Sequence, residues 1–248
     1  MKVSVITPCF NAASSIAHTI ESFLAQHHGE KEMIVVDGAS RDGTQDVVRR
    51  YGRDGVRLIS EPDRGMYDAL NKGFAAFDGD VVGALNADDT FHDRHVLGRI
   101  ADALTGADIV FGDLNFVVDH ASKRIVRRWR GGARPRGGFR TGWMPAHPTF
   151  YIRREVADAV GPFDLSLATA SDYDFMLRAV ELFDHRTVHI DAVLVDMMQG
   201  GRSTASLSAH IRHNIEALTS RRKWLNAPLV DQALVRKPAR KIGQFLVR

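Results

Sequence analysis

Residues 3–37 read VSVITPCFNAASSIAHTIESFLAQHHGEKEMIVVD, and this stretch decides the fold. Val3–Thr7 is a short apolar run that ends at Pro8 and predicts a buried strand. A helix is predicted next, because apolar side chains recur at helical spacing: Ile16, Ile20, Phe23 and Leu24. Met33–Val36 is a second apolar run, closed by Asp37-Gly38. Strand, helix and strand in this order predict two parallel strands joined by a helix.

The same rhythm continues outward from this unit. Helices are predicted from Thr44, as a capping residue, through Arg50 and at Tyr67–Phe77, and strands at Val56–Ile59 and Val81–Leu85. The chain therefore predicts an α/β fold, Rossmann-like, with a mostly parallel central sheet and helices on both faces.

After residue 105 the alternation of predicted strands and helices becomes less regular. A strand is predicted at Ile109–Phe111, and Phe116–Val118 and Ile125–Val126 are expected to pair around a turn. Gly131–Gly138 is so rich in Gly and Arg that a mobile loop without packing contacts is expected. Helical spacing returns in three later segments: Arg153–Val160, Tyr173–Phe183 and Ser206 to about Leu225.

The composition excludes several classes of protein. The 248 residues are 44% hydrophobic and 25% charged, which is ordinary for a globular protein and excludes disordered, collagen-like and coiled-coil chains. Cys9 is the single cysteine, so neither an internal disulfide nor a cysteine zinc site is expected. No apolar run is long enough to span a membrane, and the first residues do not resemble a signal peptide. A cytoplasmic protein is the expectation.

Basic residues are concentrated in two segments of the chain. Arg202–Arg248 carries ten Lys or Arg and two Asp or Glu, and Lys123–Arg140 carries eight basic residues and no acid. Such asymmetry predicts a polyanionic partner: anionic lipid, nucleic acid or the phosphates of a substrate. The C-terminal segment also mixes its cations with large apolar residues, which suits a helix on an anionic membrane surface; a solvated tail or a helix packed on the body is the alternative.

Polar residues follow each predicted strand of the first half. In open parallel sheets, ligands bind beyond the carboxyl ends of the strands, so these residues are candidates for a site. For Asp42 and Thr44, the more favoured interpretation is a turn and a helix cap. The other candidates, in chain order, are Thr7, Pro8 and Asn11; Asp37; Asp63 and Arg64; and Asn86, Asp88 and Asp89.

Asp88 and Asp89 form an adjacent pair at the end of an apolar strand. Two neighbouring carboxylates repel each other unless a cation lies beside them, and Mg²⁺ or Mn²⁺ takes oxygen ligands of this kind together with substrate phosphates. The glycine-rich motifs of dinucleotide-binding dehydrogenases and P-loop NTPases are both absent from the sequence. Phosphates are therefore expected to be held by a metal and by Arg64.

Four blocks together carry a resemblance to a known family. In order and spacing, VSVITPCFN (3–11), VVDGASRDGT (35–44), SEPDRGMYDALNKG (60–73) and LNADD (85–89) resemble the inverting family 2 glycosyltransferases, which have the GT-A fold. The block GMYDALNKG is similar to a bacterial subgroup that builds exopolysaccharide and glycolipid. The blocks cover residues 1–89, and weaker similarity continues to about residue 204.

The resemblance implies a role for each matching residue on the donor side. Asp37 would bind the nucleotide base in a pocket also lined by Thr7, Pro8 and Asn11, and Arg64, beside Asp63, would contact the base or the pyrophosphate. Asp88 and Asp89 match the metal-binding motif, with Asp89 the usual direct ligand of Mg²⁺ or Mn²⁺. The sequence departs from this motif at Asn86, where the family has an acid, so fewer charges face the metal.

On the acceptor side, the resemblance implies that Asp172 is the general base. Ser171 replaces the glutamate that usually precedes it, and Asp174 is a second choice that a helix would turn away. His147 lies in a segment similar to one that contacts the acceptor. Gly200-Gly201-Arg202-Ser203 resembles a later loop near the active site.

The resemblance implies a metal-dependent inverting transfer of a sugar from a nucleotide-sugar donor to a hydroxyl of a glycan or lipid-linked acceptor. UDP is the commonest nucleotide of the family, and GDP and dTDP are alternatives. Rival interpretations are a non-catalytic protein that binds nucleic acid or another polyanion, and a sugar-nucleotide pyrophosphorylase. No aromatic and basic recognition motif supports the former, so no nucleic acid is expected. The glycine-rich signature of the latter is not matched.

These expectations divide the chain into a GT-A domain and a basic extension. The domain is expected over residues 1–204, with a nucleotide-sugar half at 1–105 and an acceptor half at 106–204. A helical C-terminal extension is expected over 205–248, with peripheral attachment to the inner face of the cell membrane.

Overall fold

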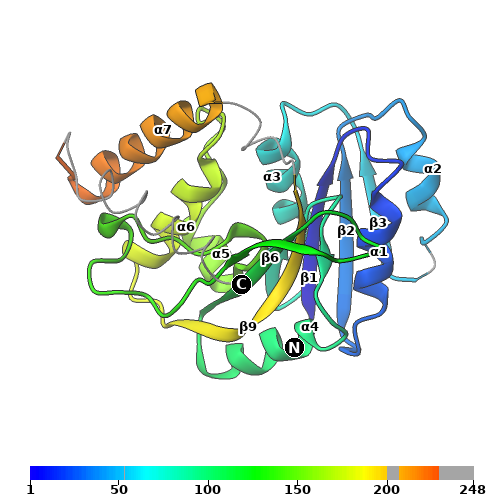
Figure 1. Ribbon diagram of the computed structural model, residues 1–248, viewed down its shortest axis with the longest axis horizontal. Coiled ribbons are helices and arrows are strands. Elements are labelled where there is room, and N and C mark those ends of the chain that lie inside the picture. Colours follow the sequence, from blue (N-terminus) through cyan, green and yellow to red (C-terminus); the bar gives the residue numbers. More distant parts are fainter. Residues whose placement is uncertain (53, 200–206, 229–248) are drawn as a thin grey trace.

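One mixed sheet with helices on both faces organises the molecule, as the computed structural model in Figure 1 shows. The structure describes residues 1–52, 54–199 and 207–228. The described strands form a nine-stranded sheet in the order β3-β2-β1-β4-β8-β6-β9-β5, with β7 paired to β6. Their bounds are β1 Val3–Cys9, β2 Lys31–Asp37, β3 Val56–Ser60, β4 Val81–Ala84, β5 Thr90–Phe91, β6 Ile109–Val117, β7 Ile125–Trp129, β8 Tyr151–Arg153 and β9 Thr187–Met198.

The first four strands are parallel, as predicted. β1 pairs with β2 and β4, and β2 pairs with β3, each in parallel register. Cys9 lies opposite Asp37, and Asp37 lies opposite Ser60, so the last residues of three strands form one row. The predicted α/β fold with helices on both faces is confirmed. Pro8 does not end β1, because the strand continues to Cys9.

The second half of the sheet contains elements that the apolar runs did not predict. β6 extends six residues beyond the predicted Ile109–Phe111, and it pairs in parallel with β9, a long strand that was not predicted. Antiparallel pairs occur at β8, β7 and β5. The predicted hairpin is confirmed, since Val117 at the end of β6 lies opposite Ile125 in β7.

Alternating side chains of β1 divide the core into two layers. Val3 and Val5 pack on one face of the sheet with apolar residues of α1 (Ile16–Leu24), α2 (Thr44–Arg49) and α4 (Val96–Ala103). Ile6 packs on the other face with α3 (Met66–Ala76), α5 (Arg154–Val160) and α6 (Ser171–Glu181). Because strand side chains alternate, one strand can bury residues against both helical layers.

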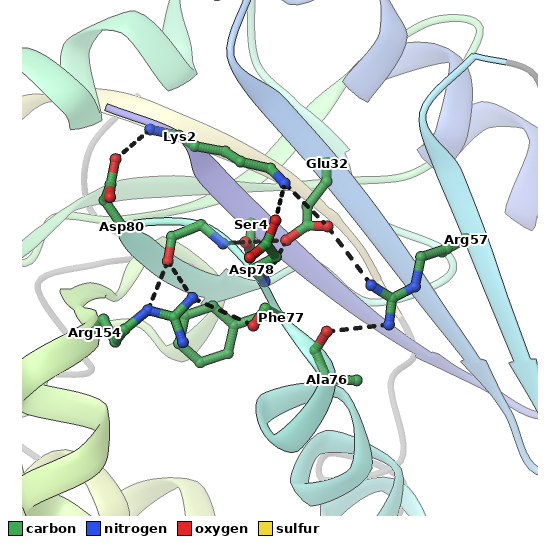
Figure 2. Close-up of polar contacts among 10 residues, drawn as sticks. Lys2, Ser4, Glu32, Arg57, Ala76, Phe77, Asp78, Asp80 and Arg154 are labelled. Carbon is green, nitrogen blue, oxygen red and sulfur yellow. Dashed lines mark hydrogen bonds and ion pairs between the residues drawn. The ribbon is translucent and has the colours of Figure 1, made fainter.

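A polar network closes the edge of the sheet at the amino ends of β1 and β2 (Figure 2). Glu32 of β2 is 9% exposed, and its Oε1 accepts hydrogen bonds from Ser4 Oγ at 2.6 Å and from the Asp78 amide at 2.7 Å. Arg154 donates to the Gly79 carbonyl at 2.7 Å and lies over the Phe77 ring. This edge is opposite the strand ends where the site was predicted, so its charges serve the fold.

A final helix, α7 (Leu207–Leu225), lies alongside α6 at the far end of the molecule from α2 (Figure 1). Its Trp224 indole donates to Asp174 of α6 at 2.8 Å, so this part of the predicted extension packs on the body. Residues 229–248, with most of the basic C-terminal sequence, lie outside the described residues. Within the described part of the chain, no helix has the length and apolar character needed to cross a membrane.

The segment Gly131–Gly138 makes specific contacts, so the expectation that it would not pack is wrong. The Gly131 amide donates to Asp113 Oδ1 at 2.8 Å, and the Gly131 carbonyl accepts from the Trp143 indole at 3.1 Å. Arg134 pairs with Glu181 at 2.7 Å. Buried partners outside the segment therefore anchor it, a feature that its own composition does not reveal.

Candidate functional site

Asp37 is the central residue at the carboxyl ends of β1, β2 and β3. Its carboxylate is fully buried and accepts hydrogen bonds from Gln45 Nε2 at 2.8 Å and Ser60 Oγ at 2.7 Å. The Ser40 amide at 3.1 Å and the Ser40 hydroxyl add two more. With its oxygens occupied in this way, Asp37 holds the loops after β2 and β3 together.

The other predicted residues of the first strand end surround this network. Thr7 and Pro8 are buried in β1, and the Thr7 hydroxyl has no hydrogen-bond partner within the described residues. Asn11 is exposed, with a left-handed φ of 51°. Its amide donates to Ser40 Oγ at 2.7 Å, and its Oδ1 accepts from the Arg41 amide at 3.0 Å. The loops after β1 and β2 therefore form one surface.

Asp63 is the carboxylate that faces this surface from the loop after β3. Its Oδ1 accepts from the Gly65 amide at 2.8 Å, while its Oδ2 lies 2.6 Å from the position that a Cβ at residue 38 would occupy. Gly38 therefore makes room for Asp63 beside Asp37. Arg64 is exposed and bonds to Asp68 of α3 through its amide at 3.0 Å. Its side chain is 75% exposed, and the guanidinium pairs with Asp68 Oδ1 at 3.5 Å.

Asp42 and Thr44 have a structural role, in line with the interpretation favoured from the sequence. Asp42 accepts from the Thr44 amide at 3.1 Å and from the Ala13 amide at 2.9 Å, so it links the loops after β1 and β2. The prediction that Thr44 caps the helix is wrong, because Gly43, with a left-handed φ of 91°, is the N-cap residue. The Thr44 hydroxyl accepts from the Ala12 amide at 2.8 Å instead.

Asp88 and Asp89 follow β4 at the same edge of the sheet. Asp89 is 1% exposed, and its carboxylate accepts from Asn86 Nδ2 at 2.8 Å and from the Met198 amide at the end of β9 at 3.1 Å. Burial and the neighbouring charge of Asp88 raise the pKa of Asp89 to about 8. Asp88 is partly exposed, and burial raises its pKa too, although the nearby His120 opposes that shift.

The donor set at this pair fits a hard cation. Asp89 is buried beside the partly exposed carboxyl of Asp88, and both burial and that neighbouring charge raise the pKa of Asp89, so a cation at this pair would be favoured. Among the described residues, no group of three or more His, Cys, Asp or Glu side chains is arranged to hold a metal ion. Mg²⁺ and Mn²⁺ commonly take one or two carboxylates together with water and substrate phosphates, so the pair suits a cation that binds with its substrate.

Asp172 lies in the first turn of α6 and is bonded to α3. Its Oδ1 accepts from Tyr67 Oη at 3.0 Å and from the Tyr173 amide at 2.8 Å. Burial and the adjacent Asp172 carboxylate raise the pKa of Tyr67, so the phenol stays protonated and donates. Tyr67 lies three residues after Arg64 in the chain. Its hydrogen bond to Asp172 therefore connects the loop after β3 to the predicted base.

His147 lies near Asp172, in the turn of 3₁₀-helix that precedes β8. Burial lowers the pKa of His147, while the charge of Asp172 acts in the opposite direction. The imidazole is therefore neutral near pH 7, and it packs edge-on against the Phe163 ring, with 6.2 Å between the ring centroids. A neutral imidazole ring can donate a hydrogen bond to a sugar hydroxyl or accept one from it.

Asp174, the second choice for the base, lies on another face of α6. It is 1% exposed, pairs with Arg178 at 2.8 Å and accepts from the Trp224 indole of α7 at 2.8 Å. The structure places it in the α6–α7 interface, where it holds helices together. The resembling loop at Gly200–Ser203 lies outside the described residues.

Two features of the candidate site were not predicted. Tyr67 lies within the block SEPDRGMYDALNKG, but the sequence did not predict its hydrogen bond to Asp172. The hydrogen bond from the Met198 amide to Asp89 was not predicted either, because it depends on β9. Several cations of Lys123–Arg140 are also engaged within the protein: Lys123 with Asp196, Arg134 with Glu181, and Arg127 over the Phe116 ring. Only long-range contacts reveal these roles.

Comparison with known proteins identifies a family. The family described as "Glycosyl transferase family 2" matches residues 4–161. A "PGL/p-HBAD biosynthesis glycosyltransferase" of Mycobacterium bovis is 31% identical over 182 residues, which cover 71% of this chain and 68% of the relative. An uncharacterized glycosyltransferase of Mycobacterium tuberculosis is 31% identical over 195 residues, covering 75% of this chain and 71% of that protein.

Solved structures of low identity share the fold. TarS of S. aureus, residues 1–349 in complex with UDP-GlcNAc, has a TM-score of 0.68 at 18% identity and covers 94% of this chain and 69% of its own. The mannosyltransferase PcManGT from Pyrobaculum calidifontis, in complex with GDP-Man and Mn²⁺, has a TM-score of 0.66 at 20% identity, covering 99% and 69%.

Proposed function

The chain belongs to glycosyl transferase family 2 and is a glycosyltransferase, and from this premise we propose that it transfers a sugar with inversion from a nucleotide-sugar donor, using Asp172 as the general base. A UDP-sugar is the proposed donor, and a hydroxyl of a glycan or lipid-linked molecule is the proposed acceptor. Family membership disfavours the pyrophosphorylase and the non-catalytic interpretations. No nucleic-acid partner is proposed.

The reaction needs a proton acceptor on the far side of the sugar from its leaving group. The acceptor hydroxyl oxygen forms a bond to C1 of the sugar as the bond from C1 to the diphosphate oxygen breaks. The hydroxyl proton passes to the Asp172 carboxylate, and the nucleoside diphosphate leaves with the bonding electron pair. Asp172 is partly exposed beside the neutral His147, so it can reach a hydroxyl, and we assign His147 to the acceptor pocket.

One observation carries this proposal: the 3.0 Å hydrogen bond from Tyr67 to Asp172. Tyr67 belongs to the helix that follows the donor-side loop, and Asp172 begins a helix in the second half of the chain. A link of this kind between the proposed base and the proposed donor side supports a transfer between two bound substrates.

On the donor side, we assign the nucleotide base to the surface formed by the loops after β1, β2 and β3. Asp37 is occupied by internal bonds, so its proposed role is to shape the pocket together with Thr7 and Pro8. Asp63 is the more accessible carboxylate and can accept a hydrogen bond from a base N–H. Asn11 lies at the rim of the pocket. Arg64 is exposed and suits the diphosphate, because guanidinium pairs well with phosphate oxygens.

We propose that Asp88 and Asp89 hold Mg²⁺ or Mn²⁺ together with the diphosphate. The bound ion would stabilise the negative charge of the leaving diphosphate. Asp88 is the more accessible of the two, whereas Asp89 is fixed by Asn86 and Met198. The raised pKa values of both carboxyls support this proposal, because a bound cation would stabilise their ionised forms.

UDP is the proposed nucleotide of the donor. UDP is favoured by the family resemblance and by the likeness to TarS, which was solved with UDP-GlcNAc. GDP is the main alternative, because PcManGT was solved with GDP-Man.

A thermal-shift screen of UDP, GDP, dTDP and CDP, each with and without Mn²⁺, tests the donor and the cation together. A ligand that binds only the folded state adds about 2.7 kcal/mol of stability at a hundred times its Kd, which is visible as a higher melting temperature. We expect UDP to raise the melting temperature, and to do so more strongly with Mn²⁺. No shift with any nucleotide, for a folded protein, would overturn the donor proposal.

We also propose that the protein is cytoplasmic and attaches peripherally to the inner face of the cell membrane. The outer face of α7 supports this, because Ile211 and Ile215 are 54% and 60% exposed beside the exposed Arg212 and Arg222. Apolar and cationic side chains on one helix face suit an anionic lipid surface. The sequence 229–248 adds further cations and apolar residues.

Truncation after residue 225 tests this attachment. The shortened protein keeps the exposed Ile211 and Ile215 of α7 but loses the cations and apolar residues of 226–248. We therefore expect it to bind vesicles that contain anionic lipid more weakly and to shift from the membrane fraction toward the supernatant. A truncated protein that remains equally associated with membranes would contradict the attachment through the C-terminal sequence.

A further inference from the structure

Helix α7 reaches the segment that carries the proposed base through Glu216. Oε2 of Glu216 accepts from the Thr169 amide at 2.8 Å, the Thr169 hydroxyl at 2.9 Å and the Ala170 amide at 3.0 Å. Its Oε1 accepts from the Ala168 amide at 3.2 Å. One carboxylate thus binds three successive backbone amides immediately before α6.

These amides have no substitute partner in α6 itself. Ala170 is the N-cap residue of the helix, and its methyl side chain cannot accept a hydrogen bond. The backbone N–H groups at a helix start need acceptors from outside the helix, and a negative charge there also interacts favourably with the helix dipole. Glu216 accepts from the N-cap amide of Ala170, as a glutamate at the N3 position does in a capping box, and it also binds the two amides before the cap. Hydrogen bonds to a carboxylate are stronger than those between neutral groups.

Other α7 side chains hold the segments on both sides of Asp172. The His213 ring lies 2.9 Å from the Thr169 carbonyl, before the base in the chain. After the base, Arg221 donates to the Tyr173 hydroxyl at 2.9 Å, and Trp224 donates to Asp174. Asp172 is the residue between these anchored segments whose carboxylate faces Tyr67 of α3.

We infer that Glu216 is a positioning residue for catalysis, which fixes the start of α6 so that the Asp172 carboxylate points at the acceptor hydroxyl. This inference rests on the proposed function, since it takes Asp172 as the base. Helix α7 is then part of the catalytic apparatus, although none of its side chains needs to touch a substrate. A misplacement of about 1 Å can lower a rate roughly a hundredfold, so a loose helix start is enough to impair transfer.

The first test compares Glu216→Ala and Glu216→Gln with a matched control, Glu32→Gln. Glu32 also accepts a backbone amide and a hydroxyl, from Asp78 and Ser4, but at the opposite edge of the sheet. We expect Glu216→Ala to lower kcat by roughly tenfold or more and to leave the donor KM within about twofold of wild type. Glu216→Gln keeps one acceptor oxygen and is expected to recover part of the loss.

The control separates positioning from general destabilisation. Glu32→Gln is expected to change the melting temperature but to leave kcat within about twofold of wild type, at a temperature where all variants are folded. If Glu216→Ala lowers kcat no more than Glu32→Gln does, the positioning role is overturned.

Hydrogen–deuterium exchange of the substrate-free protein keeps this test independent of the proposed function. We expect Glu216→Ala to speed amide exchange in a peptide covering residues 168–173, whereas Glu32→Gln leaves that peptide unchanged. Unchanged exchange in Glu216→Ala would overturn the positioning role even if the enzyme is active. A wild-type protein that transfers no sugar, while exchange responds as expected, would contradict only the assigned reaction.

Discussion

Tyr67 and Asp172, 105 positions apart in the chain, are joined by a hydrogen bond of 3.0 Å between the phenol and a carboxylate oxygen. The Tyr67 ring also stacks on Phe163, with 6.1 Å between the centroids, so packing and the hydrogen bond fix the phenol together. Because α3 directly follows the loop that carries Asp63 and Arg64, the bond ties the orientation of the proposed base to that loop.

Asp172→Asn is expected to abolish transfer while nucleotide binding survives. The amide keeps the shape of the side chain and can still accept from Tyr67, but it cannot take the acceptor proton. A positioned base contributes roughly a hundredfold to ten-thousandfold, so the loss in kcat should lie in that range. Steady-state transfer and a nucleotide thermal shift measure the two effects. A variant that keeps a tenth or more of the activity would show that Asp172 is not the base.

Tyr67→Phe is expected to lower kcat by roughly tenfold, because it removes one hydrogen bond to the proposed base, Asp172, and leaves the stacked ring in place. Tyr51→Phe is the matched control, since the Tyr51 phenol also bonds a carboxylate, that of Glu21, at 3.0 Å on the protein surface. Transfer kinetics of both variants check this. Equal activity in the two variants would show that the Tyr67 hydrogen bond to Asp172 does not contribute to transfer.

The sequence predicted those parts of the fold that depend on local signals. Apolar runs and helical spacing located β1 to β4 and the helices between them, because each element there carries its own pattern. Strand β9 was missed, although apolar residues alternate through part of Thr187–Met198, because polar residues interrupt the run. One of these, Asp196, is buried and accepts from His92 at 2.9 Å and Asn115 at 3.2 Å.

For the candidate site, the sequence pointed to residues but not to the contacts that they make. Strand ends and the family resemblance pointed to Asp37, Asp89 and Asp172. They could not show that Gln45 and Ser60 occupy the Asp37 carboxylate, nor that a helix near the end of the chain holds the start of α6. Such roles depend on contacts between distant residues, which leave no pattern in a single sequence.

Gly38→Ala is expected to weaken donor binding. The added methyl group would lie 2.6 Å from Asp63 Oδ2, so the Asp63 side chain must move away from the proposed base pocket. We expect the donor KM to rise by about tenfold with a smaller change in kcat, because one hydrogen bond to a buried ligand group is lost. Gly98→Ala is the control, since nothing lies within 4 Å of the added methyl group there. An unchanged donor KM in Gly38→Ala would argue against a contact between Asp63 and the nucleotide base.

Glu32→Ala is expected to lower the free energy of unfolding by about 2 kcal/mol without changing the donor KM. It leaves the buried Ser4 hydroxyl and the Asp78 amide without their acceptor, and unsatisfied buried groups carry costs of about 1–3 kcal/mol each. Urea denaturation measures the loss. Glu30→Ala removes only the exposed pair with the N-terminal amine and should change stability by less than about 1 kcal/mol. Similar losses in both variants would contradict the structural role of Glu32.

Asp89 is expected to destabilise the cation-free protein progressively as pH rises from about 4 to about 8. Burial and the charge of Asp88 raise the pKa of Asp89 to about 8 in the folded protein. In the unfolded chain the same carboxyl has an ordinary pKa of about 3.9. Between these values the folded state holds a proton that the unfolded state has lost, so each rise in pH favours unfolding.

Asp89→Asn should remove this contribution. In EDTA, the free energy of unfolding of the variant is expected to rise relative to wild type between pH 5 and pH 8. One pH unit in that window is worth up to about 1.4 kcal/mol, so the relative gain should be roughly 1 to 4 kcal/mol. With Mn²⁺ and UDP present, the wild-type protein is expected to regain stability at pH 8 and the variant to regain much less. A difference between the two proteins that does not vary with pH would show that Asp89 is ionised in the folded protein throughout, and that burial does not hold its proton.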